Sequence, residues 1–421
     1  MLTNFSLEQQ NTIIGTSVAT GVGAVLLGTG IGLAVTSKQN TNEISPAAIA
    51  TLTVGSILTV GGGITLTVAS LIPLILINTS SNSDGFIAQY NSSGYVQWAA
   101  QIEGTYFGTP LRISADKSGN VYVTGAFSDL ILNLYDSKKY LLDTNGITPK
   151  KTLINTSEGN FDGFIAQYDS FGRIQWAAQM GGIKSDQARG ISADNGNVYV
   201  TGIFSSDGSF NLYDASGGGF KTLTSEGYDD GFIAQYDSSG RIQWAAQMGG
   251  TLSDYGYGIS AINGNVYVTG YFGGDTSFNL YDASGGGFKT LTNEGNFDAF
   301  IAQYDSSGYV QWAAKMGGIG NDGGFGISTD QAGNLYVTGS FNSPSFNLYD
   351  ANGGGFKTLK SEGGPDGFIA QYDSSGNVKW AAKMGGIGDD QSVGISAING
   401  NVYVTGYFDS TIFNFYTPTI R

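Results

Sequence analysis

The chain of 421 residues contains no cysteine and no histidine. Without cysteine it can form neither a disulfide bond nor a thiolate metal site. Without histidine it lacks the most common general base and the most common transition-metal ligand, so serine–histidine and cysteine–histidine catalysis are excluded. We therefore expect a protein that is not an enzyme, with no catalytic residue and no cofactor.

Charged side chains are also scarce, at 13% of the residues, and they are mostly acidic, with a formal net charge of −15. Residues 1–83 contribute Glu8, Lys38 and Glu43, a net charge of −1, which leaves −14 on the rest of the chain. An acidic module of this kind repels the phosphates of nucleic acids and anionic lipid headgroups. Nucleic acid is therefore not an expected partner.

The N-terminal fifth of the chain has two long stretches without charge, residues 9–37 and 44–83. The apolar segment 13–36 would extend about 36 Å as a helix, enough for a hydrocarbon core of about 30 Å. The segment 47–77 is longer. We predict that residues 1–83 form a membrane-anchor region in which the two segments make an α-helical transmembrane hairpin. The protein would then be membrane-associated, on a side of the membrane that the sequence does not encode.

Two other interpretations of these segments stay open. Both segments are rich in glycine, and the stretch Thr51–Val54 has the composition of a strand. One alternative is a single spanning helix followed by an interfacial or re-entrant segment, and the other is a segment buried in a soluble protein or an assembly. A cleaved signal peptide is not expected, because no basic residue precedes Ile13.

From Asp84 to the C-terminus the chain consists of five near-copies of one block. Each copy carries an Asp-Gly/Ala-Phe-Ile-Ala-Gln-Tyr stretch, a tryptophan eight residues after its tyrosine, and a Gly-Asn-Val/Leu-Tyr-Val-Thr-Gly stretch. The tryptophans follow one another at intervals of 78, 68, 68 and 68 residues: Trp98, Trp176, Trp244, Trp312 and Trp380. This regularity predicts a repeat architecture.

One copy reads as two hairpins. Residues 190–202 place small and β-branched side chains on either side of a turn cluster at 194–197. Residues 232–248 repeat this arrangement around a second turn at 237–240. A repeating unit of four short strands with no helical periodicity indicates a radial β-propeller rather than a helical solenoid.

The order of the hairpins predicts the number of blades. The repeat region opens with the second hairpin of a copy, over residues 84–102, and closes with the first hairpin, over residues 394–408. The two half-blades can complete one blade between them and remove two free sheet edges. We therefore predict an all-β fold with a five-bladed β-propeller over residues 84–421.

The residues also carry a resemblance to a known family. The pattern GGTLSDYGYGISAINGNVYVTGYF, followed by DAFIAQYDSSGYVQWAAKMGG, resembles the β-propeller repeats of the SBBP type, and the strand order is similar to that of NHL propellers. The match covers about four-fifths of the chain and recurs five times in register. The resemblance implies a propeller and usually a surface or envelope protein, without implying one activity.

Four aspartates occupy equivalent places in the loops that lead from one blade to the next: Asp186, Asp254, Asp322 and Asp390. Such loops gather near the central channel of a propeller, where four carboxylates could bind a hard cation such as calcium. Alternatively, each aspartate caps its own glycine-rich turn through backbone amides. We favour the turn role and predict no metal site.

The five tryptophans are the second set of candidates. Trp244 shares one face of its predicted strand with Ile242, Ala246 and Met248, which indicates packing between blades. If exposed, the indoles would instead offer flat faces to sugar rings. An extra hairpin is predicted within each copy, over residues 209–223, 278–291 and 346–359, as a projecting edge on which a partner surface can vary.

These features together lead to one expected function and one alternative. We expect a non-enzymatic, membrane-anchored propeller that presents a rigid binding or scaffolding surface to a protein partner or to itself, in a cell envelope or a virion. The alternative is a carbohydrate-binding lectin with repeated sites between its blades.

Overall fold

The computed structural model describes residues 31–34, 51–60, 64–71, 84–105, 111–137, 149–157, 160–205, 209–274 and 277–418. Every helix or strand found in them is a β-strand, so the all-β prediction is confirmed for this part of the chain. The chain divides into two compact units. The first contains residues 1–78, 87–100 and 137–147, and the second contains the other residues.

In the first unit, three strands form an antiparallel sheet: β1 (Ile31–Ala34), β2 (Thr51–Val60) and β3 (Ile64–Leu71). The prediction of helices over residues 13–36 and 47–77 is therefore wrong wherever the structure describes those segments. Threonine, valine and isoleucine recur along β2 and β3, and their branched side chains favour extended backbone. None of the described residues belongs to a helix long and apolar enough to cross a membrane.

In the second unit, the predicted pair of hairpins is confirmed as one four-stranded antiparallel sheet. Its strands pair in chain order: β12 (Asp186–Asp194), β13 (Asn197–Ser205), β16 (Asp229–Tyr236) and β17 (Ile242–Gly249). The β12–β13 turn is tight because Asn195 and Gly196 adopt positive φ values of 50° and 81°, as a two-residue hairpin loop requires.

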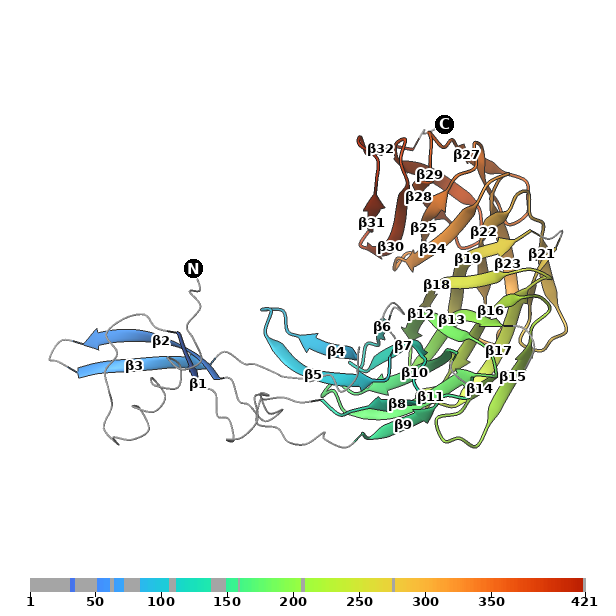
Figure 1. The fold of residues 1–421 in the computed structure, drawn as a ribbon. Helices are drawn as coiled ribbons and strands as arrows, with labels where there is room; N and C mark the ends of the chain where they lie inside the picture. The colour runs from blue at the N-terminus through green and yellow to red at the C-terminus, as the bar shows by residue number, and fades with distance from the viewer. Residues whose placement is uncertain are drawn as a thin grey trace. The chain divides into compact units, whose positions relative to one another are not determined.

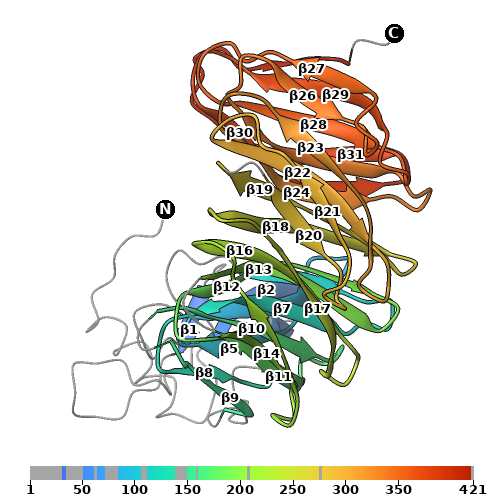
Figure 2. The same ribbon diagram turned by 90° about the vertical axis from the view of Figure 1, so that its right-hand side faces the viewer.

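Three further sheets have the same strand order and lie along the chain on either side of this one (Figures 1 and 2). The preceding sheet is formed by β6 (Arg112–Ala115), β7 (Val121–Phe127), β10 (Asp162–Tyr168) and β11 (Ile174–Gly181). The two that follow are formed by β18 (Asp254–Ile262), β19 (Asn265–Gly273), β22 (Phe297–Tyr304) and β23 (Val310–Gly317), and by β24 (Asp322–Thr329), β25 (Leu335–Phe341), β28 (Asp366–Tyr372) and β29 (Val378–Gly385).

The predicted extra hairpins are present: β14 (Ser209–Tyr213) with β15 (Phe220–Thr224), β20 (Phe278–Tyr281) with β21 (Phe288–Leu291), and β26 (Phe346–Tyr349) with β27 (Phe356–Leu359). Each one pairs through its first strand with the outermost strand of the preceding sheet, as Met248 does with Leu280. They therefore extend that sheet to six strands.

Short strands pair in the same way at the two ends of the repeat region. The hairpin of β8 (Ile131–Leu134) and β9 (Lys151–Ile154) pairs with β5 (Val96–Glu103), and β32 (Asn414–Phe415) pairs with β29. At both ends of the repeat region, as in the middle, the short strands thus pair with the outermost strand of the preceding sheet.

A serine in each innermost strand fixes the spacing of the sheets. The N–H of Ala261 in β18 donates to Ser192 Oγ in β12, at 2.9 Å. The equivalent bonds run from Ala193 to Ser114, from Thr329 to Ser260 and from Ala397 to Ser328. The strands approach closely, since a Cβ on Gly258 would lie 3.0 Å from the backbone oxygen of Phe325. This approach explains the small residues at these positions, as in the stretch Gly258-Ile259-Ser260-Ala261.

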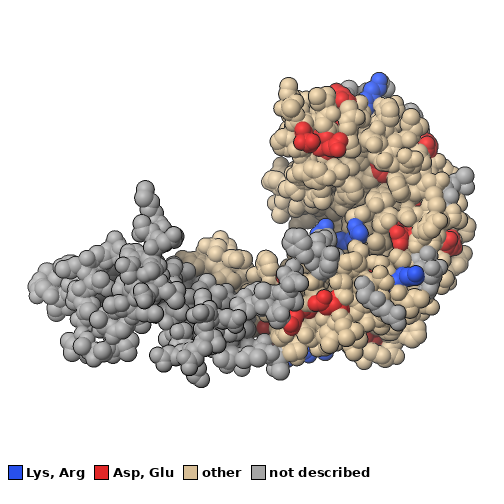
Figure 3. Space-filling view, viewed as in Figure 1, with Lys and Arg blue, Asp and Glu red and all other residues tan. Residues whose placement is uncertain are grey.

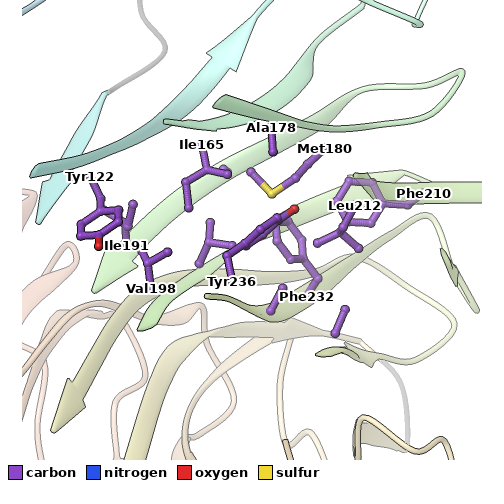
Figure 4. Packing of buried hydrophobic residues seen from close by; sticks show 14 of the residues in the cluster. Tyr122, Ile165, Ala178, Met180, Ile191, Val198, Phe210, Leu212, Phe232 and Tyr236 are labelled. Atoms are coloured by element: carbon purple, nitrogen blue, oxygen red, sulfur yellow. The ribbon is translucent and has the colours of Figure 1, made fainter. Parts of the chain in front are cut away.

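The core of this unit lies between successive sheets. Tyr122 of β7, Met180 of β11 and Val198 of β13 belong to one buried cluster, together with Phe232 and Tyr236 of β16 (Figure 4). Buried clusters of the same composition follow between the next sheets. Because each cluster combines side chains from two sheets, the repeats stabilise one another as neighbours.

The two predicted half-blades are each formed. The inner pair, β30 (Asp390–Ile398) and β31 (Asn401–Phe408), is a two-stranded sheet. The outer pair, β4 (Gly85–Tyr90) and β5, belongs to a sheet with β8 and β9. The described strands therefore supply both halves of a fifth blade in separate sheets, and the number of blades stays a prediction.

Candidate binding site

The structure places each of the four loop aspartates inside its own loop. Asp186 is buried, and its carboxylate accepts the N–H of Gly182 at 2.7 Å and that of Ser205 at 3.2 Å. Asp254 accepts the equivalent N–H groups of Gly250 and Gly273. In the last two loops a serine hydroxyl also donates: Ser343 to Asp322, and Ser410 to Asp390.

This arrangement is that of a loop-closing group, the role favoured from the sequence. Across the described part of the chain, no three or more aspartate or glutamate side chains gather closely enough to hold a metal ion. The four carboxylates satisfy local backbone donors, as carboxylates in glycine-rich turns commonly do.

A second buried aspartate stands beside each loop aspartate. Asp230 accepts the N–H of Glu226 at 2.8 Å and the Gln247 side chain at 2.5 Å through Oδ2, while its buried Oδ1 has no hydrogen-bond partner. In the next sheet Lys315 replaces the glutamine and approaches Asp298 Oδ2 to 3.8 Å. These carboxyls link the loop before the outer hairpin to the second strand of that hairpin.

Burial perturbs these carboxyl groups strongly. It raises the pKa of Asp186 to about 8. The N–H of Ser205 lowers this pKa, and the negative charge of the neighbouring Asp162 raises it further. Burial likewise raises the pKa of Asp230 to about 7 and that of Asp322 to about 6. Several of the buried aspartates therefore change protonation near neutral pH, and they do so as structural groups.

The tryptophans are packed between sheets. Trp244 stacks on Tyr304 of the next sheet, with ring centroids 6.4 Å apart, and donates its Nε1–H to Ser306 O at 3.0 Å. A Cβ on Gly308, which has a positive φ of 81°, would lie 2.7 Å from the indole. Trp176 and Trp312 make the same bond to the next sheet, and Trp98 is buried.

Trp380 has the same aromatic neighbour within its sheet as Trp176, Trp244 and Trp312, but no bond from its indole to another sheet occurs among the described residues. It packs against Tyr336 of its own sheet, with ring centroids 6.3 Å apart, and stays partly exposed. Trp98, Trp176, Trp244 and Trp312 are thus occupied by packing, and the described residues offer no row of equivalent indole faces for sugar rings.

A cluster of aromatic residues that the sequence analysis missed breaks the repeat symmetry. Tyr255 and Tyr271 lie opposite each other on β18 and β19, with ring centroids 4.7 Å apart. The ring centroid of Tyr257 lies 5.4 Å from that of Tyr271, and the ring centroid of Phe297 lies 5.2 Å from that of Tyr271. The cluster ends at Arg189 of β12, whose Cζ is 4.8 Å from the Tyr257 ring centre.

The sequence does contain a signal for this cluster, because Tyr255 and Tyr271 differ from the residues at the equivalent positions of the other copies. The cross-strand pair formed by Tyr255 and Tyr271 corresponds to pairs that are less aromatic in the other sheets: Gln187 with Ile203, Gly323 with Ser340, and Gln391 with Tyr407. Positions that vary while the surrounding core is repeated are candidates for binding rather than for packing.

A recess of about 530 Å³ lies beside the cluster. Its walls include Tyr228, Phe297, Asn296, Asn321 and Ser253, and the Tyr228 side chain is 68% exposed. Asn296 and Asn321 are exposed residues of this wall and carry amide side chains that can bind a polar ligand. A recess with one exposed phenol ring and two amides suits a small polar ring.

The loops between sheets also expose isoleucines at equivalent places. Ile183, Ile319 and Ile387 are each at least 60% exposed. Charged side chains are few and scattered on the face shown in Figure 3. The three isoleucines are therefore available to a partner that approaches these loops.

No model of a known protein family matches the chain. It is similar to an uncharacterized WD repeat-containing protein of Acanthamoeba polyphaga mimivirus, 25% identical over 388 residues, which covers 81% of this chain and 27% of the relative. It is also similar to the regulatory protein FlaEY of Caulobacter vibrioides, 25% identical over 346 residues, or 77% of this chain and 32% of the relative.

The chain spans between a quarter and a third of the length of these curated relatives. The WD repeat relative and the repeated antiparallel sheets support a protein of β-propeller repeat type. The narrower resemblance to the SBBP type stays a prediction.

Proposed function

We propose that this β-propeller repeat protein is a non-enzymatic scaffold that presents a rigid surface to a protein partner. The observation that carries the proposal is the set of exposed loop isoleucines, Ile183, Ile319 and Ile387, on a frame whose buried residues repeat. A partner that covers these aliphatic side chains would remove apolar area from water, which favours association. The name of the viral relative, a WD repeat-containing protein, is consistent with such a scaffold.

Affinity capture from the native host tests this proposal. The bait is the full chain, and the test variant replaces the three loop isoleucines by serine. We expect the test variant to lose the proteins that the wild type retains, because each truncated aliphatic side chain removes buried apolar area from the interface. The control variant replaces Phe220 and Phe288, exposed on the outer hairpins, by serine. Equal loss in both variants, or no loss in either, would contradict the proposed surface.

We further propose that the two half-blades join into the fifth blade of a closed ring. Tyr403 of β31 is 60% exposed, whereas its equivalent Tyr199 in a complete sheet is 1% exposed. Phe86 of β4 is 67% exposed, whereas its equivalent Phe232 is fully buried. Pairing β31 with β4 would bury the side chains of Tyr403 and Phe86. It would also give hydrogen-bond partners to the backbone groups at two open strand edges.

Because the chain has no cysteine, a disulfide between engineered residues reports this pairing without ambiguity. Val200 lies opposite Ala234 in a complete sheet, and the equivalent residues of the half-blades are Val404 and Ala88. We expect V404C with A88C to form an intrachain disulfide in the monomer, at a yield close to that of the control pair V200C with A234C. A disulfide only between chains, or none while the control pair forms, would rule out ring closure.

The alternative function is carbohydrate binding. The packed tryptophans give no support to repeated sites, but the recess at Tyr228, Asn296 and Asn321 favours one site per chain. Saturable binding to a glycan array that disappears with Tyr228→Ala would favour this function over the scaffold. Silence across the array, together with specific protein capture, would favour the scaffold.

We also propose that the region over residues 1–83 attaches the propeller to a membrane, in a cell envelope or a virion. The proposal rests on the two stretches without charge, 9–37 and 44–83. Flotation of the full chain with neutral lipid vesicles tests it. Recovery of the chain in the bottom fractions, free of lipid, would remove this part of the proposal.

A further inference from the structure

Two arginines stand on innermost strands, Arg112 on β6 and Arg189 on β12. The described residues include four arginines, of which Arg173 and Arg241 form ion pairs with the turn aspartates Asp169 and Asp237, at 2.7 and 2.9 Å. Within the same described residues, no carboxylate lies within ion-pair distance of Arg112 on β6 or Arg189 on β12. This is unusual in a repeat region whose net charge is −14.

The register of the strands places Arg112 beside Arg189. Arg112 pairs with Thr124 as Gly190 pairs with Thr201, so Arg112 occupies the place of the repeated glycine. A Cβ on Gly190 would lie 2.6 Å from Tyr257 O on the next innermost strand. On β12, which lies beside β6, Arg189 occupies the position that Tyr257 occupies on β18. Arg189 is therefore the residue that lies next to Arg112. Partial burial and the charge of Arg189 both lower the pKa of Arg112, as expected for like charges held close together.

Arg189 is held in place while part of its guanidinium stays unsatisfied. Its Cζ lies 4.8 Å from the ring centre of Tyr257 and 6.0 Å from that of Tyr255. Its Nη2 donates to Gln187 Oε1 at 3.0 Å, and its buried Nε has no hydrogen-bond partner. The cation–π contact with Tyr257 and the bond to Gln187 hold the guanidinium in place before any ligand binds.

We infer that Arg112 and Arg189 bind a compact oxyanion, a carboxylate or a phosphate. An anion removes the repulsion between the two guanidiniums and accepts hydrogen bonds from both. The Tyr257 and Tyr271 hydroxyls, 3.4 Å apart, offer further donors beside Arg189. The site goes beyond the proposed scaffold and does not depend on it, since neither arginine belongs to the loop surface.

Thermal unfolding of the full chain in graded phosphate tests the inference, with chloride added to hold the ionic strength constant. A ligand that binds only the folded state raises the melting temperature saturably. We expect such a rise for the wild type. For Arg112→Gln and Arg189→Gln we expect an apparent affinity for the anion at least about tenfold weaker, because each variant loses one charge-assisted hydrogen bond. A parallel series in acetate distinguishes a carboxylate site from a phosphate site.

Arg241→Gln is the matched control, because Arg241 is paired with a turn aspartate. It should respond to the anions as the wild type does. In chloride alone, Arg112→Gln should unfold at or above the temperature of the wild type, because it removes the repulsion. A rise that never saturates, a rise that is equal in all four proteins, or none in either anion would overturn the inference.

Discussion

Replacing Trp244 by alanine is expected to lower the free energy of unfolding by about 3–5 kcal/mol, the usual cost of truncating a buried tryptophan. The indole stacks on Tyr304, lies against Gly308 and donates to Ser306 O, all of the next sheet. Alanine would leave a cavity between two sheets. Urea denaturation followed by far-ultraviolet circular dichroism measures the loss.

Phe288→Ala is the control for this measurement, since Phe288 is mostly exposed on an outer hairpin and should change stability by less than about 0.5 kcal/mol. A loss below about 1 kcal/mol for Trp244→Ala would show that the stack does not hold the sheets together. Trp380→Ala adds a test of ring closure. Ser92 and Gly94 in the first half-blade correspond to Ser306 and Gly308, so a closed ring predicts an equal loss at both tryptophans.

Lowering the pH from 8 to 5 is expected to stabilise the protein, by about 2 kcal/mol or more in total. Burial raises the pKa of Asp186 to about 8, those of Asp230 and Asp298 to about 7, and that of Asp322 to about 6. An aspartate in the unfolded chain titrates near pH 4. The folded state therefore binds more protons, and this stabilisation, complete below about pH 4, is lost as the pH rises through 6 to 8. Melting temperatures across this range measure it.

Asp230→Asn should flatten this dependence, because an amide is neutral at every pH and still accepts the N–H of Glu226. We expect the variant to be more stable than the wild type at pH 8. The control is Asp237→Asn. Partial burial raises the pKa of Asp237, but N–H donation from Arg241 and Ser239 outweighs it, so the pKa is lowered. The stability from Asp237 is lost only as the pH falls below about 4, so its variant should be less stable at both pH values. A wild type that is more stable at pH 8 would contradict the assignment.

The four-stranded sheets could be predicted because their signals are local. The Asn195–Gly196 turn marks one hairpin, and the alternation around Trp244 marks a strand with one packed face. Segment 47–77 was misjudged because a long uncharged apolar run is compatible with either a helix or a strand. There the branched side chains of β2 and β3 decide in favour of strands.

What could not be predicted depends on contacts between repeats. Met248 and Leu280 pair although the hairpin of β18 and β19, which belongs to the next sheet, separates them in the chain, and no local pattern indicates which sheet an extra hairpin extends. The proposed anion site has the same origin. Arg112 stands where other repeats have glycine, but its approach to Arg189 becomes visible only once neighbouring innermost strands are aligned.

The pairing of each extra hairpin with the preceding sheet means that a sequence repeat and a structural blade are out of phase. Every six-stranded sheet is encoded by two consecutive repeats, as in β12, β13, β16 and β17 with β20 and β21. Unfolding one repeat therefore strips strands from two sheets, which strengthens the coupling between neighbours. Duplication or loss of any segment of one repeat length, whatever its starting point, would leave the contacts between neighbouring sheets unchanged. The number of blades can therefore change in evolution without requiring a new interface.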